Sequence, residues 1–372
     1  MESYINLDKN MIVNTTIGDV EVEWHDVRDI PFELYGFYEP KNSPMYWRVP
    51  HDIAALASEK IDKISQESTG GRVRFSTNSP YIAIRAKFLA VGKTQHMPLI
   101  SSAGFDLYID GEFGSRYVKE FRMPYNVKDY YEQLINLDGE FLRSYTINFP
   151  VRSVVESLEI GLKPGAVIEA PKPYRNIDPI IFYGSSIVHG TGTSHAGLAY
   201  PAIISRELNV DFRNMGFAGN AKGEAELAEW LATLPMSVFV CDYDHNTPST
   251  EHLENTHHKF YEIIREKNPN VPYIMVTAPD YWPRFNSWES LLRHRDVIMA
   301  SYLKARSNGD KNVYFIDGMS FNVAPHQYEL TVDSIHPNDA GYIRMADSIG
   351  SVIKHVLEKK IIRKENNVKG DI

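Results

Sequence analysis

The amino-acid sequence predicts two domains, an antiparallel β-sandwich followed by an α/β domain whose parallel sheet lies between two layers of helices. Three observations lead to this prediction. The chain has 372 residues, which is more than one ordinary hydrophobic core accommodates. Its first part contains short runs in which apolar and polar residues alternate, and its second part contains continuous apolar runs between segments of helical period. A proline-rich stretch separates the two parts.

Strand patterns dominate the first part, from about residue 24 to residue 162. Alternating runs, separated by Gly, Pro, Asn and Asp, occupy residues 72–75, 82–88, 105–109 and 157–160. Short strands between turn residues are typical of antiparallel sheets packed face to face. One helix, expected near residues 53–63, would decorate this sandwich.

The stretch at residues 163–179 contains four prolines and one glycine, so we expect domains at 1–170 and 171–372. Beyond it, apolar runs at 180–183, 238–241, 273–276 and 313–316 alternate with helix-period segments. Strands buried on both faces and separated by helices predict a parallel sheet, because parallel strands need crossover connections. Ligands bind at the carboxyl ends of the strands in such sheets.

Composition limits the partners of the protein. Its formal charge of -9 includes no basic cluster in the body of the chain, which argues against nucleic acid. No segment approaches the roughly 20 apolar residues of a membrane span, and the N-terminus has no leader pattern. The single Cys241 lies in an apolar run, as a buried core residue would. We therefore expect a soluble, cytoplasmic protein; its oligomeric state stays open, a homo-oligomer included.

A serine follows the first apolar run of the second part. The sequence Gly-Ser-Ser-Ile-Val-His-Gly at residues 184–190 places Ser186 at the carboxyl edge of the sheet, beside a helix N-terminus. Unpaired N–H groups at a helix N-terminus stabilise the oxyanion that forms when a serine attacks an ester carbonyl. Taken alone, the same serine fits an ordinary helix cap.

A carboxylate and an imidazole occur together near the C-terminus. In Asp-Ser-Ile-His-Pro-Asn at residues 333–338, Asp333 precedes His336 by three residues, just ahead of the final helical segment. A nucleophilic serine needs a base to accept its proton, and that base needs a carboxylate on its other nitrogen. His336 and Asp333 fit these roles, although a helix cap beside a surface histidine would give the same pattern.

Together these motifs resemble the GDSL or SGNH hydrolase family over about residues 180–357. The segment Asn-Met-Gly-Phe-Ala-Gly-Asn at 214–220 is similar to the second block of the family, which implies that the backbone of Gly219 joins that of Ser186 in an oxyanion hole. The third block, Asp-Tyr-Asp-His-Asn at 242–246, departs from the usual Gly-x-Asn-Asp. It implies Asn246 as the side-chain donor, whereas an ungapped count gives His245.

Two further features refine the resemblance. Ser185 stands where the family commonly has Asp, so a nucleophile shifted by one residue stays open. Gly-Phe-Asp-Leu-Tyr at residues 104–108 resembles the Gly-x-Asp-Leu-Tyr signature of a branch with an N-terminal β-sandwich. The resemblance implies a flavodoxin-like, three-layer SGNH hydrolase domain of five parallel strands, with no metal or organic cofactor, that cleaves esters through an acyl-enzyme.

Related two-domain esterases often deacylate sugars, and an aromatic cluster supports such a substrate here. Tyr281, Trp282, Phe285 and Trp288 follow the third apolar run, and Arg284 lies among them. Aromatic faces suit sugar rings, and a guanidinium suits a carboxylate or hydroxyl, so we expect Trp282 and Arg284 to bind substrate. Core packing for the aromatic residues and solvation for Arg284 are the alternatives.

The sequence therefore predicts a serine esterase that removes acyl groups, acetyl in the first place, from a carbohydrate or related small-molecule ester. Two alternatives remain: an acyltransferase with the same triad, and a carbohydrate-binding protein that has lost catalysis. Two other constellations suggest metal sites. His252, His257 and His258 have the spacing of an outward helix face, whereas Asp242 and Asp244 with His245 would suit a metal-dependent phosphoesterase.

Overall fold

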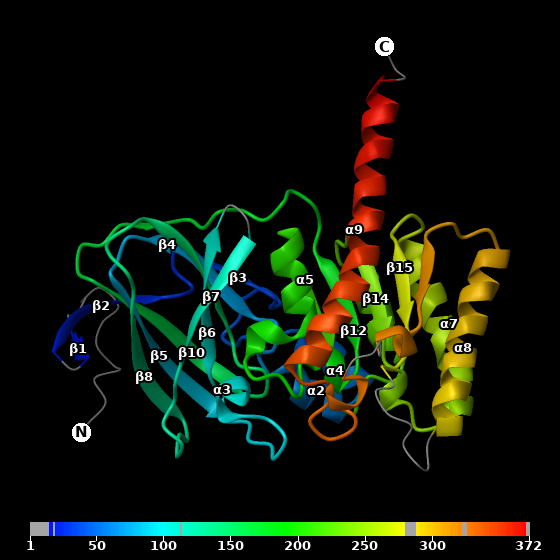
Figure 1. Cartoon of the computed structure of the whole chain (residues 1–372), viewed down its shortest axis with the longest axis horizontal. Coiled ribbons are helices and arrows are strands. Elements are labelled where there is room, and N and C mark those ends of the chain that lie inside the picture. Colours follow the sequence, from blue (N-terminus) through cyan, green and yellow to red (C-terminus); the bar gives the residue numbers. More distant parts are fainter. Residues whose placement is uncertain (1–14, 18, 112–113, 280–287, 322–325, 370–372) are drawn as a thin grey trace.

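The structure, a computed structural model, describes residues 15–17, 19–111, 114–279, 288–321 and 326–369. Figure 1 shows a β-sandwich on one side and an α/β unit on the other, with the long C-terminal helix projecting from the α/β unit. Both parts of the predicted fold class are confirmed. Within the described residues, no helix contains a stretch long and apolar enough to cross a lipid bilayer.

Two antiparallel sheets form the sandwich. The first has the order β1 (Thr15–Ile17), β2 (Val20–Asp26), β10 (Val154–Leu162), β5 (Tyr81–Ala90), β8 (Tyr130–Asn136). The second has the order β11 (Ile168–Glu169), β4 (Arg72–Thr77), β9 (Arg143–Asn148), β6 (Phe105–Gly111), β7 (Gly114–Phe121), and β3 (Glu33–Tyr35) pairs with β4. Side chains from both sheets, such as Phe75, Ile84 and Phe105, form one buried core between them. All four runs predicted from the sequence are strands.

Five parallel strands form the sheet of the α/β unit. Their order is β13 (Phe212–Gly216), β12 (Ile180–Gly184), β14 (Val238–Asp242), β15 (Tyr273–Val276), β16 (Val313–Ile316). This is the flavodoxin-like order, in which the second strand lies at one edge and the first lies inside it. The strand β13 has no apolar run in the sequence because Arg213 and Asn214 interrupt it.

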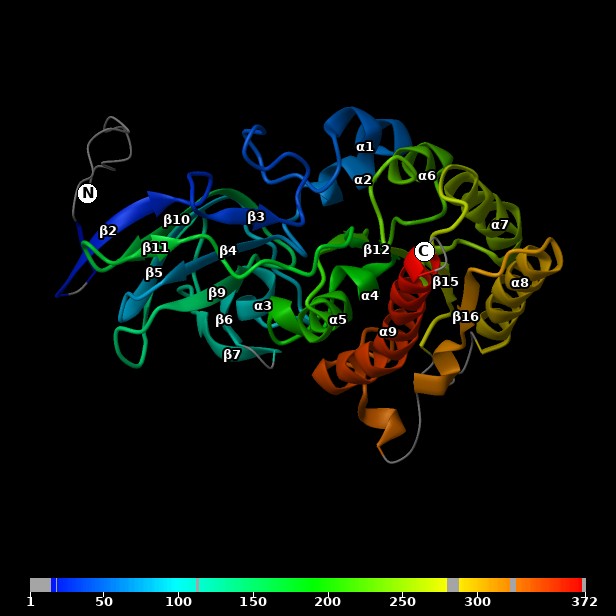
Figure 2. The ribbon, with the colours of Figure 1, turned by 90° about the horizontal axis from the view of Figure 1, so that it is seen from above.

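Helices cover both faces of this sheet (Figure 2). One face packs against α4 (Ser186–His189), α5 (Tyr200–Leu208) and α9 (Asp339–Lys369), and the other against α6 (Ala225–Leu231), α7 (Thr250–Lys267) and α8 (Trp288–Ser307). Short helical segments are α3 (Leu99–Ser102), η1 (Ala196–Leu198), η2 (Asp244–Asn246), η3 (Gly318–Phe321) and η4 (Gln327–Glu329). Cys241 of β14 is buried, as expected, and burial raises the pKa of its thiol.

The helix expected at residues 53–63 differs from the prediction in two ways. It is divided into α1 (His51–Ala57) and α2 (Glu59–Ser65), because Ser58 has an extended backbone and its hydroxyl accepts a hydrogen bond from the N–H of Ile61. It does not decorate the sandwich. Ala54 and Ile61 join the core on the α6 side of the parallel sheet, and Figure 2 shows α1 and α2 beside α6.

A fully buried arginine links this N-terminal segment to the parallel sheet. Arg48 donates hydrogen bonds to four backbone carbonyls, those of Ile64, Glu67, Asn214 and Gly216. Burial lowers the pKa of Arg48 to about 9. Two of its acceptors lie at the end of α2 and just after it, between β3 and β4, and the other two lie in β13. This side chain therefore fixes the α1–α2 segment against the parallel sheet.

The Gly-Phe-Asp-Leu-Tyr segment also lies at the contact between the two parts. The carboxylate of Asp106 accepts hydrogen bonds from the His195 ring at 2.8 Å and from the Gly197 N–H at 2.6 Å. The guanidinium of Arg206 lies 4.3 Å from the centre of the Tyr108 ring. A side chain at position 197 would meet the Tyr108 hydroxyl at 2.6 Å, so only glycine fits there. The division at residues 170 and 171 remains a prediction.

We expect Arg48→Met to lower the free energy of unfolding by about 3–5 kcal/mol, because it removes four hydrogen bonds that a fully buried guanidinium donates. Urea unfolding followed by circular dichroism measures this change. Arg122→Met is the matched control, since the Arg122 side chain is 69% exposed, and its effect should stay within about 0.5 kcal/mol. Equal effects of the two substitutions would contradict the assigned role of Arg48.

Candidate active site

Ser186 begins the helix that follows the first parallel strand. β12 ends at Gly184, Ser185 caps the helix by accepting a hydrogen bond from the Ile187 N–H at 3.2 Å, and α4 starts at Ser186. A Cβ atom at position 184 would lie 1.9 Å from the Asp242 carbonyl oxygen, so the strands approach closely only with glycine there. Ser185 is thus a buried helix cap, and Ser186 is half-buried.

The loop before α9 holds Asp333 and His336 in one turn. One carboxylate oxygen of Asp333 accepts hydrogen bonds from the backbone N–H groups of Ile335 and His336, at 3.0 and 2.8 Å. Ser334, between Asp333 and Ile335, has a φ of 69°, a conformation that non-glycine residues adopt rarely. The Val332 N–H donates to the His336 carbonyl at 2.9 Å, which closes the turn.

The structure brings the three predicted side chains into one hydrogen-bonded chain. The Ser186 Oγ lies 2.8 Å from His336 Nε2, and His336 Nδ1 lies 2.7 Å from the second carboxylate oxygen of Asp333. Burial by itself would raise the pKa of Asp333, but donors from the His336 backbone and ring hold it below the ordinary value. Because Asp333 is ionised, Nδ1 carries the proton, and Nε2 is left to accept the serine hydrogen.

The two other predicted oxyanion donors lie side by side. The Gly219 N–H donates to the Asn246 Oδ1 at 3.1 Å, and the Asn246 Nδ2 donates to the Phe217 carbonyl at 2.9 Å. Gly219 has a φ of 71°, and no atom lies within 4 Å of the place where its Cβ would be. It is Asn246, in η2, whose side chain contacts Gly219, which favours this residue over His245. Ser186, as the first residue of α4, has no partner for its N–H inside the helix.

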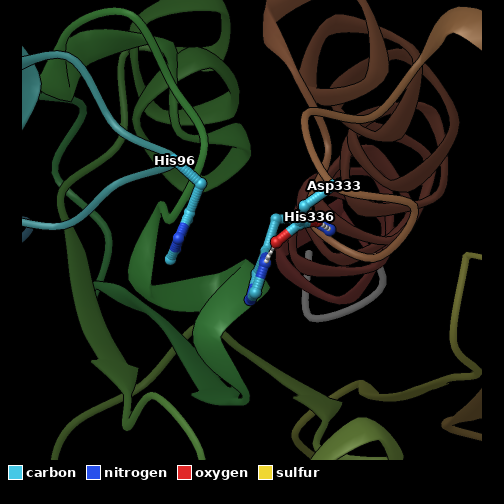
Figure 3. Close-up of side chains that lie close together, drawn as sticks. All are labelled: His96, Asp333 and His336. Carbon is cyan, nitrogen blue, oxygen red and sulfur yellow. Dashed lines mark hydrogen bonds and ion pairs between the residues drawn. The ribbon is translucent and has the colours of Figure 1, made fainter.

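A fourth polar side chain lies at this site that no sequence motif indicates. His96 comes from the segment between β5 and α3 in the sandwich, and its ring lies parallel to that of His336, with centres 5.2 Å apart and planes 8° apart. Figure 3 shows the two rings facing each other, with Asp333 behind His336. A lone histidine in a loop has no spacing that relates it to a motif more than 200 residues away, so only the tertiary structure reveals it.

His96, Asp333 and His336 form the group of possible metal ligands found among the described residues. Their ligating atoms lie within 4.8 Å of one another. Asp333 and His336 are already bonded to each other, so a metal ion would compete with the hydrogen bonds of the triad. We therefore assign Asp333 and His336 to the hydrogen-bonded chain of Ser186, and His96 lies next to this chain without a bond to it that the structure shows.

The histidines of α7 do not share an outward face, so that interpretation was wrong for His257. Its side chain is 1% exposed and stacks on Tyr243, because the helix turns this position toward the core. The alternative metal site at the end of β14 also loses support: burial raises the pKa of Asp242 well above its ordinary value, which favours a neutral carboxyl. The hydroxyl of Tyr200 bonds to this group.

The predicted substrate-binding residues Trp282 and Arg284 lie outside the described residues, as do Tyr281 and Phe285. Trp288 is the first residue of α8, and its side chain is not described. Binding of substrate by Trp282 and Arg284 remains a prediction.

A cavity of about 530 Å³ lies elsewhere, between the second sheet of the sandwich and α5. Arg72 and Arg74 line it, but each already forms a buried ion pair, with Asp211 and Asp110 respectively. None of the predicted catalytic residues lines this cavity. The serine site, on its hydrogen bonds, remains the candidate for chemistry.

A doubly wound parallel sheet with a Ser–His–Asp chain at its carboxyl edge defines a serine hydrolase. Residues 177–354 match the model of the GDSL-like lipase/acylhydrolase family, and residues 22–168 match the model of the N-terminal domain of SGNH-hydrolase-type esterases. The chain belongs to the GDSL/SGNH family, in the two-domain branch that carries the Gly-x-Asp-Leu-Tyr sandwich.

Solved structures and a curated relative agree with this assignment. A putative GDSL-like lipase from Bacteroides ovatus is 27% identical with a TM-score of 0.82, covering 91% of this chain and 98% of the other. A salicylyl-acyltransferase from a tetracycline biosynthetic pathway shares the fold at 19% identity and a TM-score of 0.70, covering 88% and 95%. A GDSL lipase of Mycobacterium tuberculosis is 31% identical over 94 residues, and the match spans 25% of this chain and 37% of that relative.

The buried His257 gives the protein a testable sensitivity to acid. Burial lowers its pKa from 6.5 to about 3, so the folded protein keeps the ring neutral while the unfolded chain binds a proton below about pH 6.5. Stability is therefore lost as the pH falls from 6.5 toward 3. The substitution His257→Phe keeps a ring against Tyr243. We expect the difference in free energy of unfolding between this variant and wild type to favour the variant by roughly 2 kcal/mol more at pH 5 than at pH 8.

Urea unfolding at the two pH values measures this difference. The exposed His355 in α9 provides the control, and His355→Phe should leave the pH dependence unchanged. A His257→Phe advantage that is the same at both pH values would contradict the neutral, buried state of the ring.

Proposed function

We propose that the protein is a serine esterase that removes acyl groups, in the first place acetyl groups, from a carbohydrate or related small-molecule ester through an acyl-enzyme on Ser186. One observation carries the proposal: the Ser186 Oγ lies 2.8 Å from His336 Nε2, while Asp333 holds the other ring nitrogen at 2.7 Å. A nucleophile, its base and the carboxylate that orients the base are the parts that acyl transfer requires.

The reaction follows from this arrangement. His336 Nε2 takes the hydroxyl proton as Ser186 Oγ attacks the ester carbonyl carbon, and the carbonyl oxygen becomes the oxyanion of a tetrahedral intermediate. When the intermediate collapses, the imidazolium returns its proton to the leaving alcohol, and the acyl group stays on Ser186. Water, activated by the same imidazole, then attacks the acyl-enzyme and releases the acid. Asp333 stays ionised and stabilises the imidazolium throughout.

The oxyanion is assigned to the N–H groups of Ser186 and Gly219 and to the side-chain amide of Asn246. Gly219 now donates to Asn246, so the oxyanion must replace the Asn246 Oδ1 as its acceptor. The free space around Gly219 suits such an exchange. A charged oxygen is a stronger acceptor than an amide oxygen, which favours the exchange in the transition state.

Fold relatives guide the choice of substrate. A family two carbohydrate esterase from Clostridium thermocellum, solved in complex with cellohexaose, has a TM-score of 0.57 at 15% identity. At this identity the likeness concerns the fold, which by itself does not define a substrate. Acetylated sugars therefore come first in a substrate panel, with an acyl-accepting alcohol added to separate hydrolysis from transfer.

We expect a fluorophosphonate to label Ser186 covalently and the wild type to hydrolyse p-nitrophenyl acetate. Ser186→Ala should abolish labelling and lower kcat by at least about 10³-fold, because no other hydroxyl occupies its position. Mass spectrometry of the labelled peptide and initial rates measure both effects.

Ser185→Ala is the matched control for this experiment. It removes the cap of α4 but leaves the nucleophile in place, so labelling should persist while stability falls by about 1 kcal/mol. If Ser185→Ala lost labelling and Ser186→Ala retained it, the nucleophile would be Ser185 and not Ser186. An unlabelled wild type without turnover on any ester would refute the enzyme function and support the carbohydrate-binding alternative.

Asn246→Ala tests the oxyanion assignment. Loss of one oxyanion donor typically lowers kcat by about 10²–10³-fold with little change in KM. His245→Ala is the control for the competing assignment. A larger loss of kcat in His245→Ala than in Asn246→Ala would reverse the choice between the two residues.

A further inference from the structure

We propose that His96 contacts the alcohol part of the ester and makes the enzyme select alcohols that carry a further hydroxyl group beside the ester. This inference rests on the proposed esterase function, and it assigns part of the substrate specificity to a residue of the sandwich. It starts from the ring of His96, which reaches the triad from the sandwich and stacks on His336.

The segment that carries His96 is anchored on both sides. Before it, the Gly92 N–H donates to the Ser153 hydroxyl at 3.1 Å. Directly after it, Met97 is buried against Val151 and against Ala196 of the α/β unit. The sandwich thus presents His96 at a fixed position next to the parallel-sheet domain.

A second contact joins α3, which follows His96, to the loop between α4 and η1, which follows Ser186. The hydroxyl of Ser101 in α3 lies 2.9 Å from that of Thr193. Because anchors lie on both sides of His96, the parallel stacking on His336 follows from the packing of the two parts of the chain.

The nitrogens of His96 are available to a ligand. The ring is half-buried and makes no hydrogen bond to any residue in the described part of the chain. A neutral imidazole offers one donor and one acceptor, and at least one nitrogen of His96 lies within 4.8 Å of polar atoms of Asp333 and His336. Such a group suits a hydroxyl, which also donates and accepts.

The chemistry of the site determines which half of the substrate comes closest to His96. The leaving oxygen must receive its proton from His336 Nε2, so the alcohol part of the ester lies against the His336 ring when the intermediate collapses. His96 stacks on that ring. The acyl part is bonded to Ser186 and extends away from the departing oxygen. The partner of His96 is therefore a hydroxyl of the alcohol, such as the neighbouring hydroxyl of a sugar or of glycerol.

The experiment compares two esters of the same acid. In p-nitrophenyl acetate the alcohol part has no hydroxyl, whereas a monoacetylated methyl glucoside has hydroxyls next to the ester. We expect His96→Phe, which keeps a ring beside His336 but removes both nitrogens, to lower kcat/KM at least tenfold on the glucoside acetate. On p-nitrophenyl acetate the same variant should stay within threefold of wild type.

Two further variants separate recognition from support of the fold. His96→Asn, which restores a donor and an acceptor, should recover part of the loss on the glucoside acetate. Gln95→Ala, at the exposed neighbouring position, should leave both substrates unaffected. A parallel loss on both esters would reduce His96 to a packing residue and overturn the inference, as would unchanged kinetics on both.

Labelling by a fluorophosphonate keeps the two proposals apart. A wild type that is not labelled and cleaves neither ester would overturn the esterase function, and the inference would fall with it. A wild type that is labelled and cleaves p-nitrophenyl acetate but shows no preference for hydroxyl-bearing alcohols would overturn the role of His96 alone.

Discussion

The hydrogen bond between Ser186 and His336 joins residues 150 positions apart in the sequence. It forms only because the packing of the α/β unit brings the two ends of that unit together. Ser186 follows the first parallel strand, and His336 precedes the last helix, so the distance between their side chains depends on how α9 packs on α4. Tyr342 of α9 places its hydroxyl 3.0 Å from the Ile187 carbonyl and 2.7 Å from that of Thr191. A Cβ atom at position 192 would lie 2.4 Å from the Pro337 carbonyl, so glycine is required for this approach.

The sandwich also contacts the segment that follows Ser186, at residues 189–197. The carboxylate of Asp106 binds His195 and Gly197, and the Thr69 hydroxyl donates to the His189 carbonyl at 2.6 Å. The Gly-x-Asp-Leu-Tyr segment therefore lies where the sandwich contacts the α/β unit. Its Asp106 carboxylate accepts hydrogen bonds from a side chain and from a backbone N–H of that unit. Since both α9 and the sandwich contact the segment that follows Ser186, the two parts of the chain together hold the candidate active site.

The features that the sequence predicts are those that depend on interactions between residues close together in the chain. Four strands of the sandwich, four of the five parallel strands and the Asp333–His336 pair were predictable, because periodicity and a three-residue spacing are local properties. β13 was not, because Arg213 and Asn214 hide an edge strand whose polar groups bond within the fold: the Asn214 side chain donates to the Val188 carbonyl at 2.7 Å. The docking of α1 and α2, the burial of His257 and the position of His96 all depend on contacts between distant segments, which a single sequence does not specify.

In the proposed oxyanion site, the hydrogen bond from the Gly219 N–H to Asn246 holds the two donor residues next to each other. Breaking this neutral hydrogen bond costs about 1 kcal/mol, whereas a bond to a charged oxygen contributes about 1.5–3 kcal/mol. The exchange is therefore favourable only once negative charge develops on the carbonyl oxygen. A carbonyl in the ground state gains little from it, so the arrangement favours the transition state over the bound ester.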